Sequence, residues 1–221
     1  MGDELGLFPL KLVLFPTERI PLHIFEPRYK ELIGECLEAE SEFGLVLADE
    51  DGTRSVGTRA AVVHVLEVFD DGRLNILVEG RERFRIVVET DGRSFRTGEV
   101  EPVEDEDDPP ATSEIDRALE VFGQLVEVTE TEEVDEPDRS SGVLSFELAA
   151  RVDFGPELKQ EILELRSERE RLIRLADLFD VVVQGLKLEK DVRERASGNG
   201  KVNRRPQLPG REGDGDGDST S

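Results

Sequence analysis

Asp-Gly pairs recur at residues 51–52, 71–72 and 91–92, between short apolar segments, and this spacing constrains the fold more than any other feature. Glycine adopts a positive φ at no steric cost, so each pair favours a tight turn between two strands. We therefore expect an antiparallel meander. An internal repeat is the alternative, although the flanking residues share little beyond the turn. The expected strands are residues 43–48, 60–69, 74–79, 84–88 and 94–103.

A helix pattern interrupts the strands after residue 26. Pro27 suits the first helical position because its φ is fixed. Apolar residues then recur at helical spacing, while charged residues take the opposite face. This pattern predicts a helix that covers one face of the sheet. Its apolar stripe consists of Tyr29, Leu32, Ile33, Cys36 and Leu37.

Composition divides the chain into four parts. Residues 1–103 form a strand-rich lobe, and residues 104–113 form an acidic linker that contains prolines. Residues 114–196 carry helical patterns. Residues 197–221 are rich in Gly, Pro and charged residues and have little to bury, which predicts a disordered tail.

The helical lobe is expected to contain several helices. The first carries apolar residues at helical spacing from Ile115 to Val126, the second spans residues 143–152, and the third opens at Pro156. Ser167 and Glu170 have the spacing of a capping box and precede the clearest long amphipathic helix in the chain.

The charge balance is strongly acidic, with 52 acidic and 28 basic residues and a formal net charge of -24. Such a field repels nucleic-acid phosphates and anionic membranes. Arg81, Arg83 and Arg85 alternate along one expected strand and therefore share a face, with Phe84 on the other. In a basic protein this stripe would suggest RNA binding. Among so many carboxylates, ion pairs are the favoured interpretation, with Phe84 in the core.

Several features indicate a cytoplasmic protein. Asp3 and Glu4 stand where a signal peptide needs positive charge, and Gly6 stands where a myristoylation motif needs Ser or Thr. No apolar run approaches the roughly 20 residues of a membrane span. The single cysteine, Cys36, cannot form an intramolecular disulfide and suggests a reducing compartment.

The sequence offers little for catalysis, metal binding or cofactor binding. Its two histidines, His23 and His64, both lie in strand patterns, where a structural role is favoured over that of a catalytic base. These histidines and Cys36 lack the close spacing of zinc ligands. Residues 52–59 look like a phosphate-binding loop but carry Arg59 where the motif needs Ser or Thr. We expect no catalytic residue, metal or cofactor.

Three segments carry a resemblance to a known family: FPLKLVLFP at 8–16, PLHIFEPRYKELI at 21–33 and LVEGRERFRI at 77–86. Together with the helical segment that follows, they resemble the N-terminal substrate-binding domain of Lon proteases in its freestanding bacterial form. The resemblance implies an α+β fold, in which an antiparallel β pseudo-barrel of the PUA-like type has one covering helix and is followed by a C-terminal helical bundle. It also implies contact with polypeptide substrates. No reaction is implied, because the chain has no ATPase motif and too little length for ATPase and protease domains.

In the family's fold, residues 21–33 resemble the joint where a barrel strand turns into the covering helix. Arg28 is unfavourable near a helix N-terminus because of the helix dipole, so we expect it to have a carboxylate partner, Glu26 or another. The residues assigned to this structural joint are Leu22, His23, Glu26, Pro27, Arg28 and Tyr29.

A proline-bounded loop supplies the candidate binding surface. Phe15, Pro16 and Ile20 are expected to form an exposed apolar patch at the barrel rim, because an exposed loop hydrophobe has few other roles. The alternative is that they plug the barrel end. The leading hypothesis is a non-enzymatic module that binds unfolded polypeptide or a protein partner, such as an adaptor in protein quality control. A PUA-like RNA-binding module is the alternative, and the net charge disfavours it.

Overall fold

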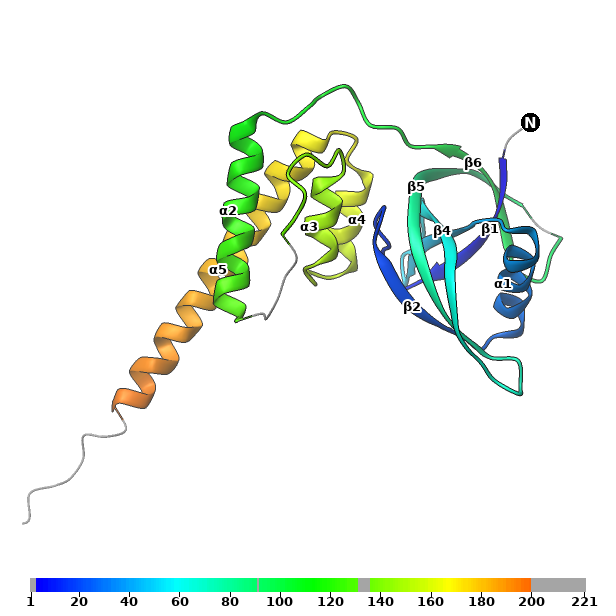
Figure 1. Ribbon diagram of the computed structural model, residues 1–221, viewed down its shortest axis with the longest axis horizontal. Helices are drawn as coiled ribbons and strands as arrows, with labels where there is room; N and C mark the ends of the chain where they lie inside the picture. The colour runs from blue at the N-terminus through cyan, green and yellow to red at the C-terminus, as the bar shows by residue number, and fades with distance from the viewer. Residues whose placement is uncertain (1–2, 91, 131–135, 200–221) are drawn as a thin grey trace, which may run out of the picture.

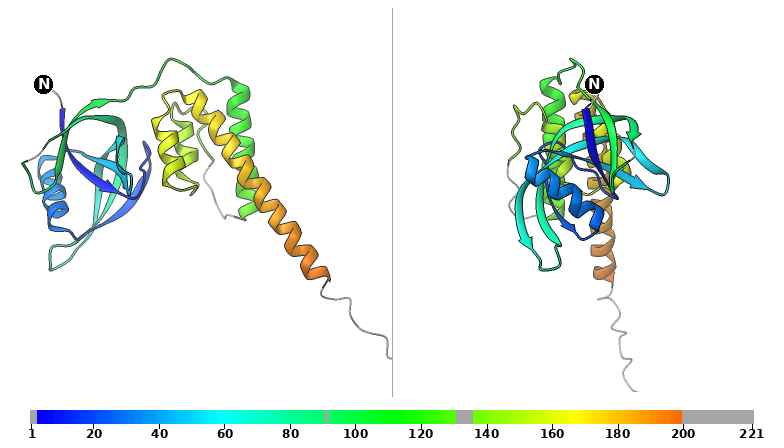
Figure 2. Two further views of the ribbon diagram at one scale, coloured as in Figure 1. Left: turned by 180° about the vertical axis from the view of Figure 1, so that it is seen from behind. Right: turned by 90° about the vertical axis from the view of Figure 1, so that its right-hand side faces the viewer.

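The computed structural model describes residues 3–90, 92–130 and 136–199, which form an α+β protein (Figure 1). A strand lobe and a helical lobe lie side by side along the long axis, and the last helix projects from the far end (Figure 2). The strand lobe contains β1 (Asp3–Leu10), β2 (Arg19–Ile24), α1 (Pro27–Ala39), β3 (Phe43–Asp49), β4 (Gly52–Val68), β5 (Leu74–Thr90) and β6 (Arg96–Pro102). The helical lobe contains α2 (Thr112–Thr129), α3 (Leu144–Ala150), α4 (Pro156–Glu164) and α5 (Glu168–Asn199).

The six strands form a mixed sheet in the order β2-β5-β4-β3-β1-β6, and β5 also pairs with β6. The expectation of a purely antiparallel sheet is wrong, because β1 and β3 pair in parallel, with Leu7 opposite Gly44. The chain passes through β2 and α1 between these two strands, and a crossover of this kind lets them run in the same direction. The remaining pairs are antiparallel.

β4 and β5 form a long hairpin that projects beyond the body of the sheet (Figure 1). The sequence suggested two short strands where β5 is one strand of 17 residues. Gly80 and the charged residues around it interrupt the apolar pattern. The strand nevertheless continues, because three neighbouring strands pair with it along its length. β2 pairs with its first half, β6 pairs with its second half, and β4 pairs along both.

Helix α1 begins at Pro27 and buries the predicted stripe, as expected. Tyr29, Leu32, Ile33 and Cys36 are buried with residues from β2, β3 and β5 in one core cluster. Leu37, the last member of the stripe, is 39% exposed and marks the edge of this face.

The helices of the second lobe share a core with one end of the sheet. Val13, Phe15, Leu47 and Val56 from the strand lobe belong to the same buried cluster as the helical residues. Helices α2 and α5 run parallel, and α5 continues past the end of α2 (Figure 1). Ser167 caps α5 as predicted, because its Oγ accepts a hydrogen bond of 3.0 Å from the Glu170 N–H.

The structure also bears on the boundaries expected from composition. Helix α2 begins at Thr112, inside the predicted linker, and α5 continues through residue 199. The rest of the predicted disordered tail lies outside the described residues. None of the described helices is long and apolar enough to cross a membrane.

Candidate functional site

The joint between β2 and α1 is built from local contacts. Glu26 is the N-cap residue of α1, and its Oε2 lies 2.8 Å from Arg28 Nη2. The Arg28 guanidinium also lies over the Tyr29 ring, 4.5 Å from its centroid. Tyr29 and Leu22 are buried, so the joint packs its apolar members inward and uses the expected carboxylate partner to hold Arg28.

His23 lies on the outward face of β2. Its Nδ1 is 2.6 Å from Asn75 Oδ1 on β5, and its ring contacts Phe25 and Phe69 with centroid distances of 5.9 and 6.0 Å. Asn75 Nδ2 in turn donates to Glu67 Oε2 at 2.9 Å. These contacts place His23 in a chain of side chains across three strands rather than beside a nucleophile.

The predicted rim patch is not exposed as expected. Phe15 is completely buried, which contradicts its assignment to an exposed surface. Its ring stacks on Phe146 of α3 with a centroid distance of 5.5 Å, because the helical lobe covers this end of the sheet. Ile20 is partly buried and packs against the sheet core, while Pro16 lines a groove between the lobes.

An ion network beside the Phe146 ring joins the two lobes. Arg171 is fully buried, and all five of its N–H donors are used. Asp105 from the linker accepts from Arg171 and also from Arg83 of β5. Burial alone would raise the pKa of the Asp105 carboxyl, but hydrogen bonds and charges from the two arginines outweigh it and lower the pKa. Arg83 therefore forms a structural ion pair, in agreement with the interpretation of the arginine stripe.

The groove beside this network has a volume of about 510 Å³. Its lining combines apolar residues, among them Pro16, Val103 and Phe146, with charged residues that include Glu82. It marks the seam between the strand lobe and the helical lobe. Its arginines are already paired, Arg81 with Glu79 and Arg83 with Asp105.

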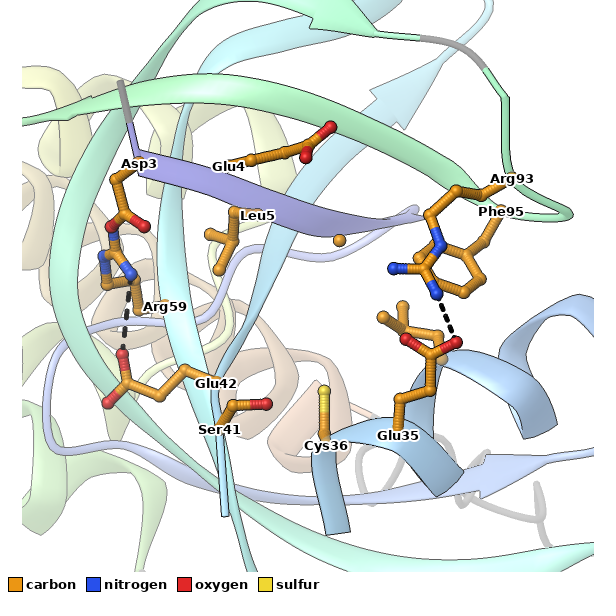
Figure 3. Close-up of a pocket in the computed structure, with 12 residues that line it drawn as sticks. Asp3, Glu4, Leu5, Glu35, Cys36, Ser41, Glu42, Arg59, Arg93 and Phe95 are labelled. Carbon is orange, nitrogen blue, oxygen red and sulfur yellow. Dashed lines mark hydrogen bonds and ion pairs between the residues drawn. The ribbon is translucent and has the colours of Figure 1, made fainter. Parts of the chain in front are cut away.

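A second hollow, of about 270 Å³, lies between α1, β1 and the segment before β6, with the Cys36 thiol at its base (Figure 3). Ion pairs of Arg93 with Glu35 and of Arg59 with Asp3 border it. Burial raises the pKa of the Cys36 thiol, which disfavours the reactive thiolate. The hollow therefore offers ionic and polar contacts but no activated nucleophile.

Within the described ranges, no three His, Cys, Asp or Glu side chains are grouped to hold a metal ion. Nor is either histidine in these ranges hydrogen-bonded to a serine, threonine or cysteine side chain. His23 and His64 face the same side of the three-stranded end of the sheet, since they pair with Asn75 and Leu77 of β5, two residues apart. The described geometry thus provides no assembled catalytic group.

Four exposed apolar side chains of the strand lobe lie at the far end of the sheet, and we call them the hairpin patch: Phe25, Val65, Leu66 and Val68. Phe25 is 59% exposed and follows the end of β2. Leu66 and Val68 are 57% and 67% exposed and lie near the tip of β4. β2 and β4 flank β5 here, with Ile24 and Val68 both opposite Leu74. Val68 therefore lies on the face of the buried Ile24, whereas Phe25 has the strand parity of His23 and lies on the opposite face. The hairpin patch is thus a group of exposed apolar side chains on both faces of the three-stranded end of the sheet.

Sequence reasoning passed over the hairpin patch, although two signals for it exist. Phe25 has the same strand parity as the outward-facing His23, so alternation places it outside. The run from Ala60 to Phe69 is apolar at both parities, so a sheet covered on one face must expose some of it.

The fold thus defines an α+β protein that has a mixed sheet, one covering helix and a second, helical lobe. Residues 4–180 match the family described as the ATP-dependent protease La (LON) substrate-binding domain. The match covers most of the chain, so this protein belongs to that family. The resemblance seen in its sequence motifs is confirmed.

Similar proteins agree with this assignment. A Lon protease of Paraburkholderia phytofirmans is 27% identical over 216 residues, and one of Solibacter usitatus is 30% identical over 212 residues. The aligned parts are 89% and 87% of this chain but 26% of each protease, so the chain spans about a quarter of these relatives.

Two solved structures share the fold. The Lon N-terminal domain protein from Xanthomonas campestris is 27% identical with a TM-score of 0.62, over 78% of this chain and 96% of that one. The N-terminal domain of Mycobacterium avium complex Lon protease has a TM-score of 0.63 at 18% identity, over 80% and 98% of the two chains. At that identity the second likeness concerns the fold alone.

Proposed function

We propose that this chain is a non-enzymatic module that binds unfolded polypeptide through the hairpin patch. The matched family is described as substrate-binding, which supports a role in recognition. No reaction is proposed, because the described side chains form neither a nucleophile-base pair nor a metal-binding group. Binding of clients for a protease or chaperone, as an adaptor does, is consistent with such a module.

The exposure of the hairpin patch is the observation that carries the proposal. Single exposed apolar residues are common on protein surfaces, but several gathered at one projecting end are typical of an interaction site. Leu66 and Val68 lie near the hairpin tip, where they contribute little to the core clusters of the strand lobe. Their exposure therefore fits a role in contact with a bound polypeptide better than a role in stabilising the fold.

The charge of the molecule limits the kind of client. At a net charge of -24, polyanions such as RNA are repelled, and neutral or basic polypeptide segments are favoured. The arginines of the stripe on β5 also lie beside carboxylates, Arg81 beside Glu79 and Arg85 beside Glu101. These pairs argue against a free basic surface for RNA.

A double substitution, Leu66→Ser with Val68→Ser, tests the proposal. Binding to reduced, carboxymethylated α-lactalbumin, a permanently unfolded polypeptide, is measured by fluorescence anisotropy. We expect a Kd of roughly 1–100 μM for the unaltered protein, because a small patch buries less area than a tight complex needs. The double variant should bind at least about tenfold more weakly, since two apolar contacts are lost.

The matched control is Val181→Ser with Leu188→Ser on α5. These two side chains are 72% and 65% exposed, similar to the hairpin pair, but lie in the other lobe. The control variant should bind like the unaltered protein. Equal binding by the hairpin variant, with its fold intact by circular dichroism, would contradict the assignment of the site.

A further inference from the structure

One edge of β4 is unpaired near the hairpin tip. β4 pairs with β3 only as far as Ala60, which lies opposite Phe43, whereas its pairing with β5 continues to Val68. Within the described part of the chain, residues 61–68 therefore have a strand partner on one side only. Such an edge presents backbone N–H and C=O groups to an incoming strand.

The edge of β2, on the other side of the same three strands, is blocked. Pro21 lies opposite Leu77 in the middle of β2. Proline has no N–H, so it fits here only where its nitrogen faces away from β5, which removes a donor from the outer edge. An added strand would lose that hydrogen bond.

The edge of β4 has little of this protection. Residues 61–68 contain no proline and no lysine, and their one charged residue, Glu67, accepts a hydrogen bond from Asn75. Val65, Leu66 and Val68 are exposed along it. Two register shifts, between Val62 and His64 and between Val65 and Glu67, twist the edge. They restrict an added strand to a few consecutive pairs, which makes the contact weak rather than impossible.

We propose that an extended polypeptide segment binds by adding a strand to residues 61–68 of β4, an inference that rests on the proposed function. Pairing through backbone groups recognises any extended chain, whatever its sequence. Neighbouring apolar side chains add a preference for segments that carry apolar residues. Leu66 and Val68 supply those contacts, so the edge and the hairpin patch form one site.

The preferred occupant is an apolar segment with basic flanks, not a second copy of this chain. Glu67, Asp70 and Asp71 give the hairpin tip negative charge. Arg73, which pairs with Asp71, and Lys30, whose Nζ donates to Asp71 O at 2.9 Å, offset it only in part. Two such tips side by side would repel each other, and two molecules of net charge -24 add to that repulsion. Lysines at the ends of a bound segment would instead be attracted.

The test compares two peptides with the same side chains. One is the acetylated, amidated peptide KVTVIVTK, and the other carries N-methyl groups on all its interior amides. N-methylation removes the N–H donors and blocks both strand edges but keeps the apolar side chains. We expect the methylated peptide to bind the full chain at least about tenfold more weakly. The plain peptide should also slow hydrogen exchange of amides in residues 61–68 but not in residues 19–24.

The outcomes separate the inference from the function on which it rests. Equal binding of both peptides, lost in the Leu66→Ser, Val68→Ser variant, would overturn strand addition and leave the hairpin patch as the site. Absence of binding by both peptides and by unfolded α-lactalbumin would overturn the proposed function itself. A dimer that protects residues 61–68 without peptide would assign the edge to a second copy and overturn the inference.

Discussion

Phe15 and Phe25 are the same residue type ten positions apart, yet they have opposite roles. Phe15 is fully buried and stacks on Phe146, and its N–H donates to Glu18 Oε2 at 2.8 Å. Phe25 is 59% exposed and contacts His23. The helical lobe covers Phe15 but leaves Phe25 uncovered, so the surroundings decide the role of each residue.

Substituting each phenylalanine by alanine should therefore have very different effects on stability. Phe15→Ala should lower the free energy of unfolding by about 3–5 kcal/mol, because a large aromatic leaves a cavity between the lobes. Phe25→Ala should lower it by less than about 1 kcal/mol, since its ring is largely in water already. Urea denaturation measures both, and the two substitutions serve as controls for each other. A stable Phe15→Ala protein would contradict the burial of this side chain.

At the scale of elements, β5 depends on one small residue where a loop crosses it. Gly80 donates its N–H to Glu18 O, and its own O accepts from the Thr17 N–H, both at 2.9 Å. A Cβ at position 80 would lie 2.0 Å from Phe15 O. The loop can approach β5 this closely only because Gly80 has no side chain.

Gly80→Ala should destabilise the protein by about 2 kcal/mol or more, because backbone atoms must move to relieve the clash. The matched control is Gly34→Ala in α1, where a new Cβ meets nothing within 4 Å. That change should raise stability by up to about 1 kcal/mol, since alanine favours a helix over glycine. Thermal unfolding of the two variants distinguishes these effects. Equal stability of both variants would show that the loop does not approach β5 as described.

Local patterns predict most of these elements, but not how they meet. The turn spacing and the stripe of α1 indicated the strands and the covering helix because both signals lie within a few residues. The sequence around Gly80 suggested a break in β5, since no local pattern shows that a distant loop docks there. In the same way, the burial of Phe15 depends on Phe146, far along the chain. The expectation that Phe15 is exposed was therefore wrong.

At the scale of the whole molecule, the linker is part of the lobe interface. Asp105 accepts from Arg83 of β5 and Arg171 of α5, and Arg171 also binds Glu168. The acidic composition of the linker predicted a boundary, and in the structure β6 ends at Pro102 and α2 begins at Thr112. The sequence did not indicate that one of its carboxylates neutralises two buried arginines, because both partners come from other elements.

Asp105→Asn should lower the free energy of unfolding at pH 7 by about 3 kcal/mol, because two buried guanidinium groups lose their shared carboxylate. The matched control is Asp177→Asn, which removes an exposed pair with Arg117 of 2.6 Å and should change stability by less than about 1 kcal/mol. Urea denaturation at pH 7 gives both values.

The effect of Asp105→Asn should depend on pH in a definite direction. The pKa of Asp105 is lower in the folded state than in the unfolded state, so its contribution is complete above the unfolded value of about 3.9. It is lost as the pH falls through the folded-state value. The difference in stability between the unaltered protein and the variant should thus shrink below about pH 4. A constant difference down to pH 2 would show that the carboxylate is not the group responsible.

The position of β1 has a consequence for the order in which the chain can fold during synthesis. This first strand lies between β3 and β6, with Asp3 opposite Val100. Ribosomes add about 5–20 residues per second, so β1 waits roughly 5–20 s after it is made before its β6 partner exists. During that interval Leu5 and Leu7 lack Val100, a member of the buried cluster that finally encloses them. A nascent chain of this protein therefore exposes apolar side chains of β1 that favour aggregation, and a chaperone that binds them early would protect the chain.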